Sequence, residues 1–178
     1  FWLICISIMS LTILMAFQSF LPLYLKEVFN LSAGEAGISS SVFPLGSMLS
    51  VFIGGFIFDK LTKKKRIFVL GSMMALATGC IVTLLWLPES NIQKASLLPI
   101  GLSAIMIFGL MIAPCYLIPM SVFSLGFGGK HCGFLVGIID AAGYTASMVF
   151  EFLGGSIADQ VNGWQQFLQV ILNVSIIG

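Results

Sequence analysis

Long stretches of apolar residues, interrupted by short polar turns, run along the whole chain. A helix needs about 20 apolar residues to span the hydrocarbon core of a bilayer. The apolar stretches have about this length, and the turns between them hold most of the charged residues. They predict six membrane spans, near Phe1–Leu25, Ala36–Phe58, Ile67–Leu87, Ala95–Leu117, Cys132–Gly155 and from Trp164 onward. The pattern therefore predicts an all-α, polytopic transmembrane helical bundle.

Both ends of the sequence fall within apolar runs. Phe1 already lies inside an apolar run, and the last run reaches Gly178 after only 15 residues, which is short for a complete span. We therefore expect residues 1–178 to be one six-helix transmembrane half-domain that is truncated at both ends. The first run lacks the basic start and the small-residue cleavage pattern of a signal peptide, so we interpret it as a span.

Composition supports a membrane protein. Hydrophobic residues make up 58% of the chain and charged residues 8%, which is far more apolar than a soluble domain. The formal net charge of +1 gives no information about nucleic acid. For a membrane protein of this kind we expect the partners to be the lipid bilayer and a small-molecule solute, with no nucleic acid. The cysteines lie in four different spans without metal-ligand spacing, so we expect packing residues and no metal or other cofactor.

A cationic turn follows the second span and predicts the orientation. Lys60 and the run Lys63–Arg66 supply five cations, and short loops rich in Lys and Arg stay on the cytoplasmic side. Alternation then places six of the eight cations inside and two outside. The predicted turns are Lys26–Glu35, Pro88–Lys94 and Asp159–Asn162 outside, and Lys60–Arg66 and Ser124–Lys130 inside.

The connections are short, so we expect successive helices to be antiparallel neighbours. Ser32 and Glu35 have the spacing of a capping box, which predicts the start of the second span. Four prolines lie within or at the ends of spans, where they either bend the helix or are simply tolerated. They are Pro22, Pro44, Pro114 and Pro119.

An internal repeat organises the six spans. Gly54–Asp59 closes the second span, and the similar Gly154–Asp159 closes the fifth span one hundred residues later. These spans are the middle members of two three-helix units, and because three is odd the second unit enters the membrane inverted. Inverted repeats of this kind occur in secondary transporters. A chance match in a chain so rich in glycine is the alternative.

The end of the second span carries a family resemblance. It resembles the loop motif Gly-x-x-x-Asp-Arg/Lys-x-Gly-Arg/Lys-Arg/Lys of the major facilitator superfamily, with Thr62 in place of the second Gly. The matching positions are Gly55, Asp59, Lys60, Lys63 and Lys64. The resemblance covers the chain as one half of a twelve-helix fold, and Asp140 with the end of the fifth span points to the carboxy-terminal half. It implies an amino-terminal six-helix half, or a second copy, as a further partner.

The motif also has a physical interpretation as a gate. At the inner end of the second span, Asp59 can accept from the free N–H groups at the start of the fifth span, near Lys130–Gly133. Lys60 and Lys63 can pair with the same carboxylate or with lipid phosphate. We expect this latch to hold the cytoplasmic side closed in one state. The alternative is that the cations only set topology.

The fifth span carries a polar face. Asp140, Tyr144, Ser147 and Glu151 follow at i, i+4, i+7 and i+11, which places them on one side of a helix. An acid within the membrane normally faces a bundle interior or a water-filled cavity. We expect Asp140 to line the solute or coupling path, Tyr144 and Ser147 to be hydrogen-bonding partners, and Glu151 to lie toward the outer mouth.

Alternatives stay open at several of these positions. Asp140 can instead be a buried structural acid, and Glu151 an interfacial residue. Gln18 in the first span can bind the solute or join two helices. Phe17, Phe20 and Tyr24 can be packing residues or cavity wall.

Within the superfamily, the chain most resembles the organophosphate and sugar-phosphate:phosphate exchangers. Leu21–Val28, Gly137–Gly143 and Gly155–Trp164 carry this resemblance. It implies exchange of a sugar phosphate for phosphate. Bacterial members have an arginine in the first helix of this half, whereas Phe1–Leu25 contains none. Since phosphate needs cationic or multiple N–H partners, either the other half supplies the cations or the solute is not a phosphate.

These features predict secondary-active transport of a small polar or anionic solute by alternating access. Proton-coupled symport using Asp140 is the alternative mechanism, and a non-transporting sensor or partner subunit is the alternative class. We do not expect an enzyme, because the single histidine, His131, lies at an interface and no HExxH-type motif occurs.

Overall fold

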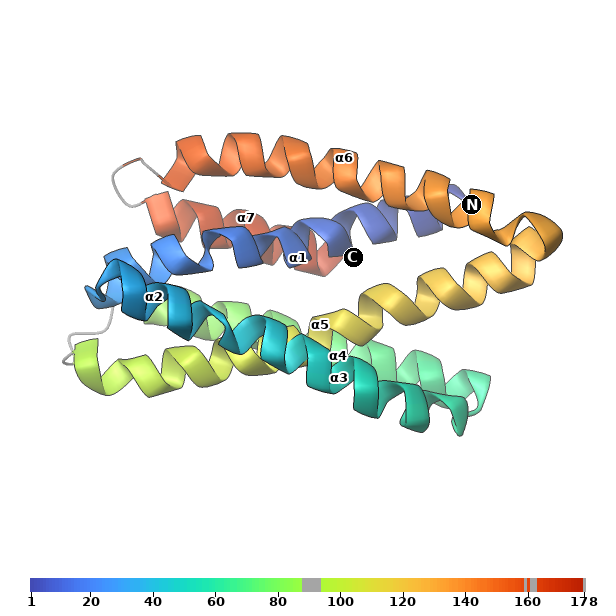
Figure 1. The fold of residues 1–178 in the computed structure, drawn as a ribbon, viewed down its shortest axis with the longest axis horizontal. Helices are drawn as coiled ribbons and strands as arrows, with labels where there is room; N and C mark the ends of the chain where they lie inside the picture. The colour runs from blue at the N-terminus through green and yellow to red at the C-terminus, as the bar shows by residue number, and fades with distance from the viewer. Residues whose placement is uncertain (88–93, 159, 161–162, 178) are drawn as a thin grey trace.

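The computed structural model describes residues 1–87, 94–158, 160 and 163–177, and it is helical apart from short turns. Figure 1 shows the long helices side by side along one axis of the molecule. The elements are α1 (Trp2–Phe29), α2 (Ala33–Ser40), α3 (Val42–Asp59), α4 (Lys63–Trp86), α5 (Lys94–Gly128), the 3-10 turn η1 (Gly129–His131), α6 (Cys132–Ala158) and α7 (Gly163–Ile177). The all-α prediction is thus confirmed for the described residues.

Several helices are long and apolar enough to cross a bilayer. Within the described residues these are Trp2–Phe29, Ala33–Asp59, Lys63–Trp86 and Ser96–Ala158. The last stretch contains both α5 and α6, which turn back on each other at η1 (Figure 1). The chain is therefore a multi-pass membrane protein, while the count of six spans stays a prediction.

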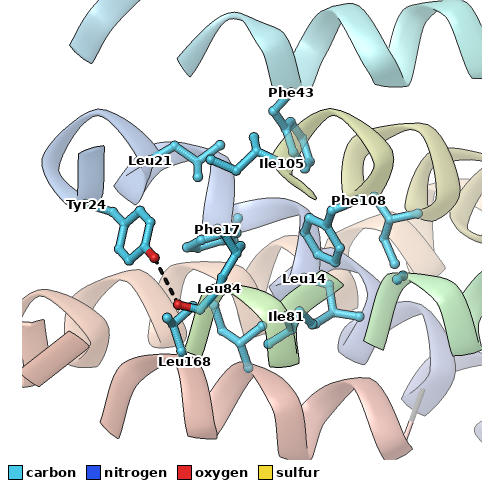
Figure 2. Close-up of a cluster of buried hydrophobic side chains, with 14 of the residues drawn as sticks. Leu14, Phe17, Leu21, Tyr24, Phe43, Ile81, Leu84, Ile105, Phe108 and Leu168 are labelled. Carbon is cyan, nitrogen blue, oxygen red and sulfur yellow. Dashed lines mark hydrogen bonds between the residues drawn. The ribbon is translucent and has the colours of Figure 1, made fainter. Parts of the chain in front are cut away.

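The helix α1 lies at the centre of the core. It packs against α2, α5, α6 and α7, and its Phe17 is fully buried. The ring of Phe17 meets those of Tyr24, Phe108 and Phe167 at centroid distances of 6.4, 6.0 and 6.1 Å. Figure 2 shows that the buried side chains of this cluster come from several helices. Phe17 and Tyr24 are therefore packing residues and not part of a cavity wall.

Local sequence signals explain the turn from α1 into α3. Asn30 ends α1 in the left-handed conformation with φ of 57°, which asparagine tolerates better than most residues. The predicted capping box is confirmed, with the Glu35 amide donating to Ser32 Oγ and the Ser32 amide donating to the Glu35 carboxylate. Pro44 has no N–H group to donate to the carbonyl of Ser40, and α2 ends at Ser40.

Packing partners differ from the sequence prediction of successive neighbours. The main partner of α3 is α5, and the main partner of α1 is α6. At the α3–α5 crossing, Gly46 faces the backbone of Met106, and Gly109 faces the backbone of Phe43. Ser47 Oγ also donates to the carbonyl of Gly109 at 3.1 Å. The prediction is confirmed for α4 with α5, α5 with α6 and α6 with α7, which do pack together, and it is wrong for α3 and α4. Short turns constrain only the helix ends, whereas small residues far apart in sequence decide which helices approach closely.

The helix α5 is longer than predicted. It continues through Pro114 and Pro119 to Gly128, so the expected cytoplasmic turn Ser124–Lys130 shrinks to η1, where Gly129 has φ of 49°. Figure 1 shows that α5 changes direction along its length. The physical reason for the continued helix is that unpaired backbone groups are costly in lipid, so a helix there bends at proline more readily than it ends.

The turns group at the two ends of the bundle. The α3–α4 turn and the α5–α6 turn lie at one end, and the α1–α2 turn lies at the other (Figure 1). Lys60 and Lys130 are therefore at the same end, as the predicted topology requires. The turns Pro88–Lys94 and Asp159–Asn162 fall largely outside the described residues, and so does Asp159 of the proposed repeat.

The buried faces of α3 and α6 correspond at the repeat spacing. The buried residues of α3 are Phe43, Gly46, Ser50, Gly54 and Phe58, and those of α6 are Ile139, Gly143, Phe150, Gly154 and Ala158. Four of these pairs lie one hundred residues apart: 43 with 143, 50 with 150, 54 with 154 and 58 with 158. The likeness of the two glycine pairs thus extends along both helices as a shared pattern of burial.

The Tyr24 hydroxyl provides a test of this packing. It donates to the carbonyl of Leu84 at 3.0 Å (Figure 2), and four positions after Leu84 the sequence has Pro88, which has no backbone N–H. Tyr24→Phe leaves that buried carbonyl without this donor. We expect a loss of about 1–3 kcal/mol in the free energy of unfolding, measured by thermal unfolding in detergent. Tyr144→Phe, at a 66% exposed residue, is the control and should be neutral. Equal stabilities of the two variants would contradict the assignment.

Candidate functional site

The polar face of α6 meets a tyrosine from α5. Tyr116 Oη donates to Asp140 Oδ1 at 2.8 Å, and both residues are half-buried. The hydrogen-bonding partner of Asp140 is thus a neutral side chain on another helix. The sequence pattern had suggested Tyr144 and Ser147, on the same helix as Asp140, as hydrogen-bonding partners. The α5–α6 contact therefore positions Asp140, the first of the two acids of α6.

Close approach of α1 and α6 completes this arrangement. A side chain at Gly143 would collide with the Thr12 hydroxyl, which would lie 2.6 Å from its Cβ. Thr12 is buried, and its hydroxyl donates to the carbonyl of Ile8 at 2.7 Å. The lack of a side chain at Gly143 therefore lets α1 lie against α6 one turn beyond Asp140.

A pocket of about 270 Å³ lies between these three helices. Its lining combines residues from α1, the tyrosine of α5 and the polar face of α6. The lining residues are Thr12, Met15, Ala16, Gln18, Tyr116, Tyr144, Ser147 and Glu151. The structure thus brings Gln18, Tyr144, Ser147 and Glu151 to one pocket, as their predicted roles require. Asp140 is outside the lining, and the phenol of Tyr116 connects it to the pocket.

The carboxylate of Glu151 is also held by a hydroxyl. Ser19 Oγ of α1 donates to Glu151 Oε1 at 3.2 Å, and both residues are exposed. Both acids of the α6 polar face therefore accept from neutral hydroxyl groups of neighbouring helices. None of the residues lining the described pocket is cationic.

Sequence reasoning missed Tyr116, Thr12 and Ser19. Thr12 and Ser19 lie on α1, which only the tertiary fold brings against α6, whereas Tyr116 lies on α5, the helix that precedes α6. A weak signal existed for Tyr116, since it is the single tyrosine of α5 and follows Pro114 by two residues. Thr12 and Ser19 have no comparable signal, because hydroxyl residues are common in transmembrane helices and usually bond to their own backbone.

The predicted gating motif lies at the α3–α4 turn. Asp59 ends α3 and Lys63 begins α4, and the side chains of Asp59, Lys60, Lys63 and Lys64 are exposed, as is Gly55. Across the described residues, no hydrogen bond or ion pair involves the Asp59 carboxylate. The motif therefore lies at the α3–α4 turn, and the predicted latch is not formed in this conformation.

A second pocket, of about 350 Å³, lies beside this motif. Gly55, Asp59 and Arg66 line it together with Leu125 of α5, and Arg66 Nε donates to the carbonyl of Leu61 at 3.0 Å. The helix facing Asp59 is thus α5, whereas the sequence pattern suggested the start of α6. The contact with α6 stays a prediction for another conformational state.

The four cysteines, Cys5, Cys80, Cys115 and Cys132, are free thiols. Cys5 and Cys115 are buried, and Cys115 Sγ donates to the carbonyl of Leu70 at 3.6 Å, which joins α5 to α4. No group of three or more potential metal ligands occurs in the described part of the chain. Cys115 therefore serves helix packing.

Comparison with known proteins places the chain in a family. None of the curated proteins matches the sequence. The family model described as Major Facilitator Superfamily matches residues 1–150, a span that includes the α3–α4 motif and most of α6. The chain therefore belongs to the Major Facilitator Superfamily.

Proposed function

We propose that this chain carries out secondary-active transport of a small polar solute by alternating access, with the pocket between α1, α5 and α6 on the solute path. Membership of the superfamily supports membrane transport as the class of function. The observation that carries the proposal is the pocket itself, in which Gln18, Ser147 and Glu151 meet Tyr116, the partner of Asp140. Such convergence of polar groups in a transmembrane bundle is typical of a solute or ion pathway.

The inverted repeat is part of this proposal. Exchanging the first three spans with the last three maps the α1–α6 contact onto the α5–α3 contact. Both are extensive helix contacts among the described residues. The matched burial of α3 and α6 supports the same relation. Two inverted units that rock against each other around a fixed site are a known route to alternating access.

A second six-helix bundle is proposed to complete the pocket. Tyr144 is 66% exposed and Gln18 is also exposed, although both line the pocket. Polar groups of this kind at membrane depth need protein or water around them. The covering bundle would be either an amino-terminal half of the same polypeptide or a second copy of this chain, and the cationic α3–α4 turn would face the cytoplasm.

Two coupling mechanisms are compatible with this path. Proton-coupled symport is favoured by the Tyr116–Asp140 hydrogen bond, because it holds a protonatable group one side chain from the pocket. Exchange of a sugar phosphate for phosphate rests on the resemblance to that branch of the superfamily. Exchange requires cations from outside this pocket, since no lining residue is cationic.

The test is transport by the complete protein in liposomes. Solute uptake driven by a pH gradient without solute inside the vesicles would support symport, whereas uptake that requires a solute on the opposite side would support exchange. A pH indicator inside the vesicles should report proton entry that accompanies the solute. A protein that inserts correctly but moves no member of a broad panel of sugars, polyols, phosphates and amino acids would point to a sensor or partner subunit.

Asp59→Ala tests the proposed gate. If the α3–α4 motif holds the cytoplasmic side closed in one state, we expect the variant to shift the balance between inward-open and outward-open forms several-fold. Accessibility of a cysteine placed at Leu125, which faces the same pocket, measures this balance. Lys65→Ala, which removes a cation outside the motif, is the control. Unchanged accessibility with normal insertion would leave the motif with a role in topology alone.

A further inference from the structure

The chemistry of the pocket lining indicates which part of a solute it can hold. Gln18, Ser147 and Tyr144 each have both a donor and an acceptor, and Glu151 adds two acceptor oxygens. A solute hydroxyl is itself both donor and acceptor, so it pairs with every one of these groups. This mixture differs from a site for an anion, which consists of donors with positive charge.

Charge in the described structure argues against an anionic group in this pocket. The charged residue in the lining is Glu151, a carboxylate. The cations Lys26, Lys60, Lys63–Arg66 and Lys130 occur near helix ends, and none lines this pocket. A phosphate dianion would face the like charge of Glu151 without a compensating cation from the pocket lining, and like charges repel.

The existing hydrogen bonds show that both acids accept from neutral hydroxyl groups. Ser19 donates a neutral hydroxyl to Glu151 at 3.2 Å, and Tyr116 donates one to Asp140 at 2.8 Å. The Tyr144 ring, 66% exposed, offers an apolar face at the same pocket. Carboxylate acceptors, amide and hydroxyl groups beside an aromatic face match an uncharged ring or chain that bears several hydroxyls. An ammonium group, in contrast, would leave the donors of Gln18 and Ser147 unused.

We infer that this pocket binds the uncharged, polyhydroxylated part of the transported solute, a sugar or polyol moiety, and that it does not hold a phosphate group. The inference rests on the proposed function, because it names the class of solute for the same pocket. If the solute is a sugar phosphate, its phosphate binds outside these three helices.

Equilibrium binding to the purified complete protein tests the inference. The probes are radiolabelled glucose, sorbitol, glucose 6-phosphate, inorganic phosphate and choline. We expect at least one of the three polyhydroxylated probes, glucose, sorbitol or glucose 6-phosphate, to bind. Gln18→Ala and Ser147→Ala should each weaken this binding by about tenfold, as loss of a hydrogen bond in a site would. Any binding of inorganic phosphate should change less than twofold. Ser72→Ala, an exposed serine of α4 bonded to the carbonyl of Val69, is the matched control.

Three results would overturn the inference. The first is choline binding that Glu151→Gln abolishes, in the absence of sugar binding. The second is phosphate binding that Gln18→Ala or Ser147→Ala weakens as strongly as sugar binding. The third is that none of the polyhydroxylated probes binds. Gln18→Asn provides a milder change in case an alanine variant folds poorly. Accessibility of the pocket from the two sides of the membrane needs no solute, so failure of this inference is distinguishable from failure of the transport proposal.

Discussion

Replacing Gly46 with alanine is expected to destabilise the protein, although alanine is normally the better helix residue. A Cβ atom at Gly46 would collide with the carbonyl oxygen of Met106 in α5 and approach the amide nitrogen of Leu110 to 3.2 Å. Both are backbone atoms of a packed helix, so neither can rotate away as a side chain would. We expect a loss of about 1–3 kcal/mol in the free energy of unfolding from overpacking, and a larger loss for Gly46→Leu.

The same substitution at Gly79 should not destabilise the protein. At Gly79 in α4, an added Cβ would meet no atom within 4 Å, so Gly79→Ala should be neutral or slightly stabilising, by up to about 1 kcal/mol. The measurement is the midpoint of thermal unfolding of both variants in the same detergent. A Gly46→Ala midpoint equal to or above that of the wild type would show that α3 and α5 do not cross as described.

Asp140→Asn is expected to lower proton-driven accumulation of solute strongly. Asparagine keeps the size of the side chain and can still accept from Tyr116 through its carbonyl oxygen, but it cannot bind and release a proton. Under the symport mechanism, we expect accumulation driven by a pH gradient to fall at least tenfold, while downhill equilibration of solute continues. The pair of assays separates loss of coupling from loss of the pathway. Full accumulation by Asp140→Asn would exclude Asp140 as the coupling group.

Tyr116→Phe is the companion variant. It removes the hydroxyl that links Asp140 to the pocket and keeps the ring. If Tyr116 acts through Asp140, the double variant with Tyr116→Phe and Asp140→Asn should accumulate no less solute than Asp140→Asn alone. Both changes then remove the same link between Asp140 and the pocket. Tyr144→Phe is the comparison, because it removes a tyrosine hydroxyl elsewhere in the pocket. Independent, additive losses from Tyr116→Phe and Asp140→Asn would contradict the linked role.

Features that depend on neighbouring residues were predictable from the sequence. The capping box of Ser32 and Glu35 occurs as expected, since both partners lie within one turn. The polar face of α6 was predictable because helical spacing alone aligns Tyr144, Ser147 and Glu151. The cationic turn ends α3 and begins α4 where the charges interrupt the apolar pattern.

Features that depend on distant contacts were not predictable. The partner of Asp140 lies 24 positions earlier in the chain, on α5, and no periodicity relates the two residues. The pairing of α3 with α5 depends on Gly46 and Gly109, which in sequence look like the many other glycines of the chain. The fourth span was predicted to end at Leu117, yet α5 continues through Pro119 to Gly128 because membrane helices absorb proline by bending.

We expect the pocket between α1, α5 and α6 to open in turn to each side of the membrane. The direct measurement places a single cysteine at Ser147, in a complete protein whose native cysteines are replaced, and adds a membrane-impermeant thiol reagent to one side of sealed vesicles at a time. We expect labelling from both sides, with a cysteine at exposed Thr83 of α4, outside this pocket, as the control for non-specific access. Labelling of the Ser147 cysteine from one side only, or from neither, would contradict the account.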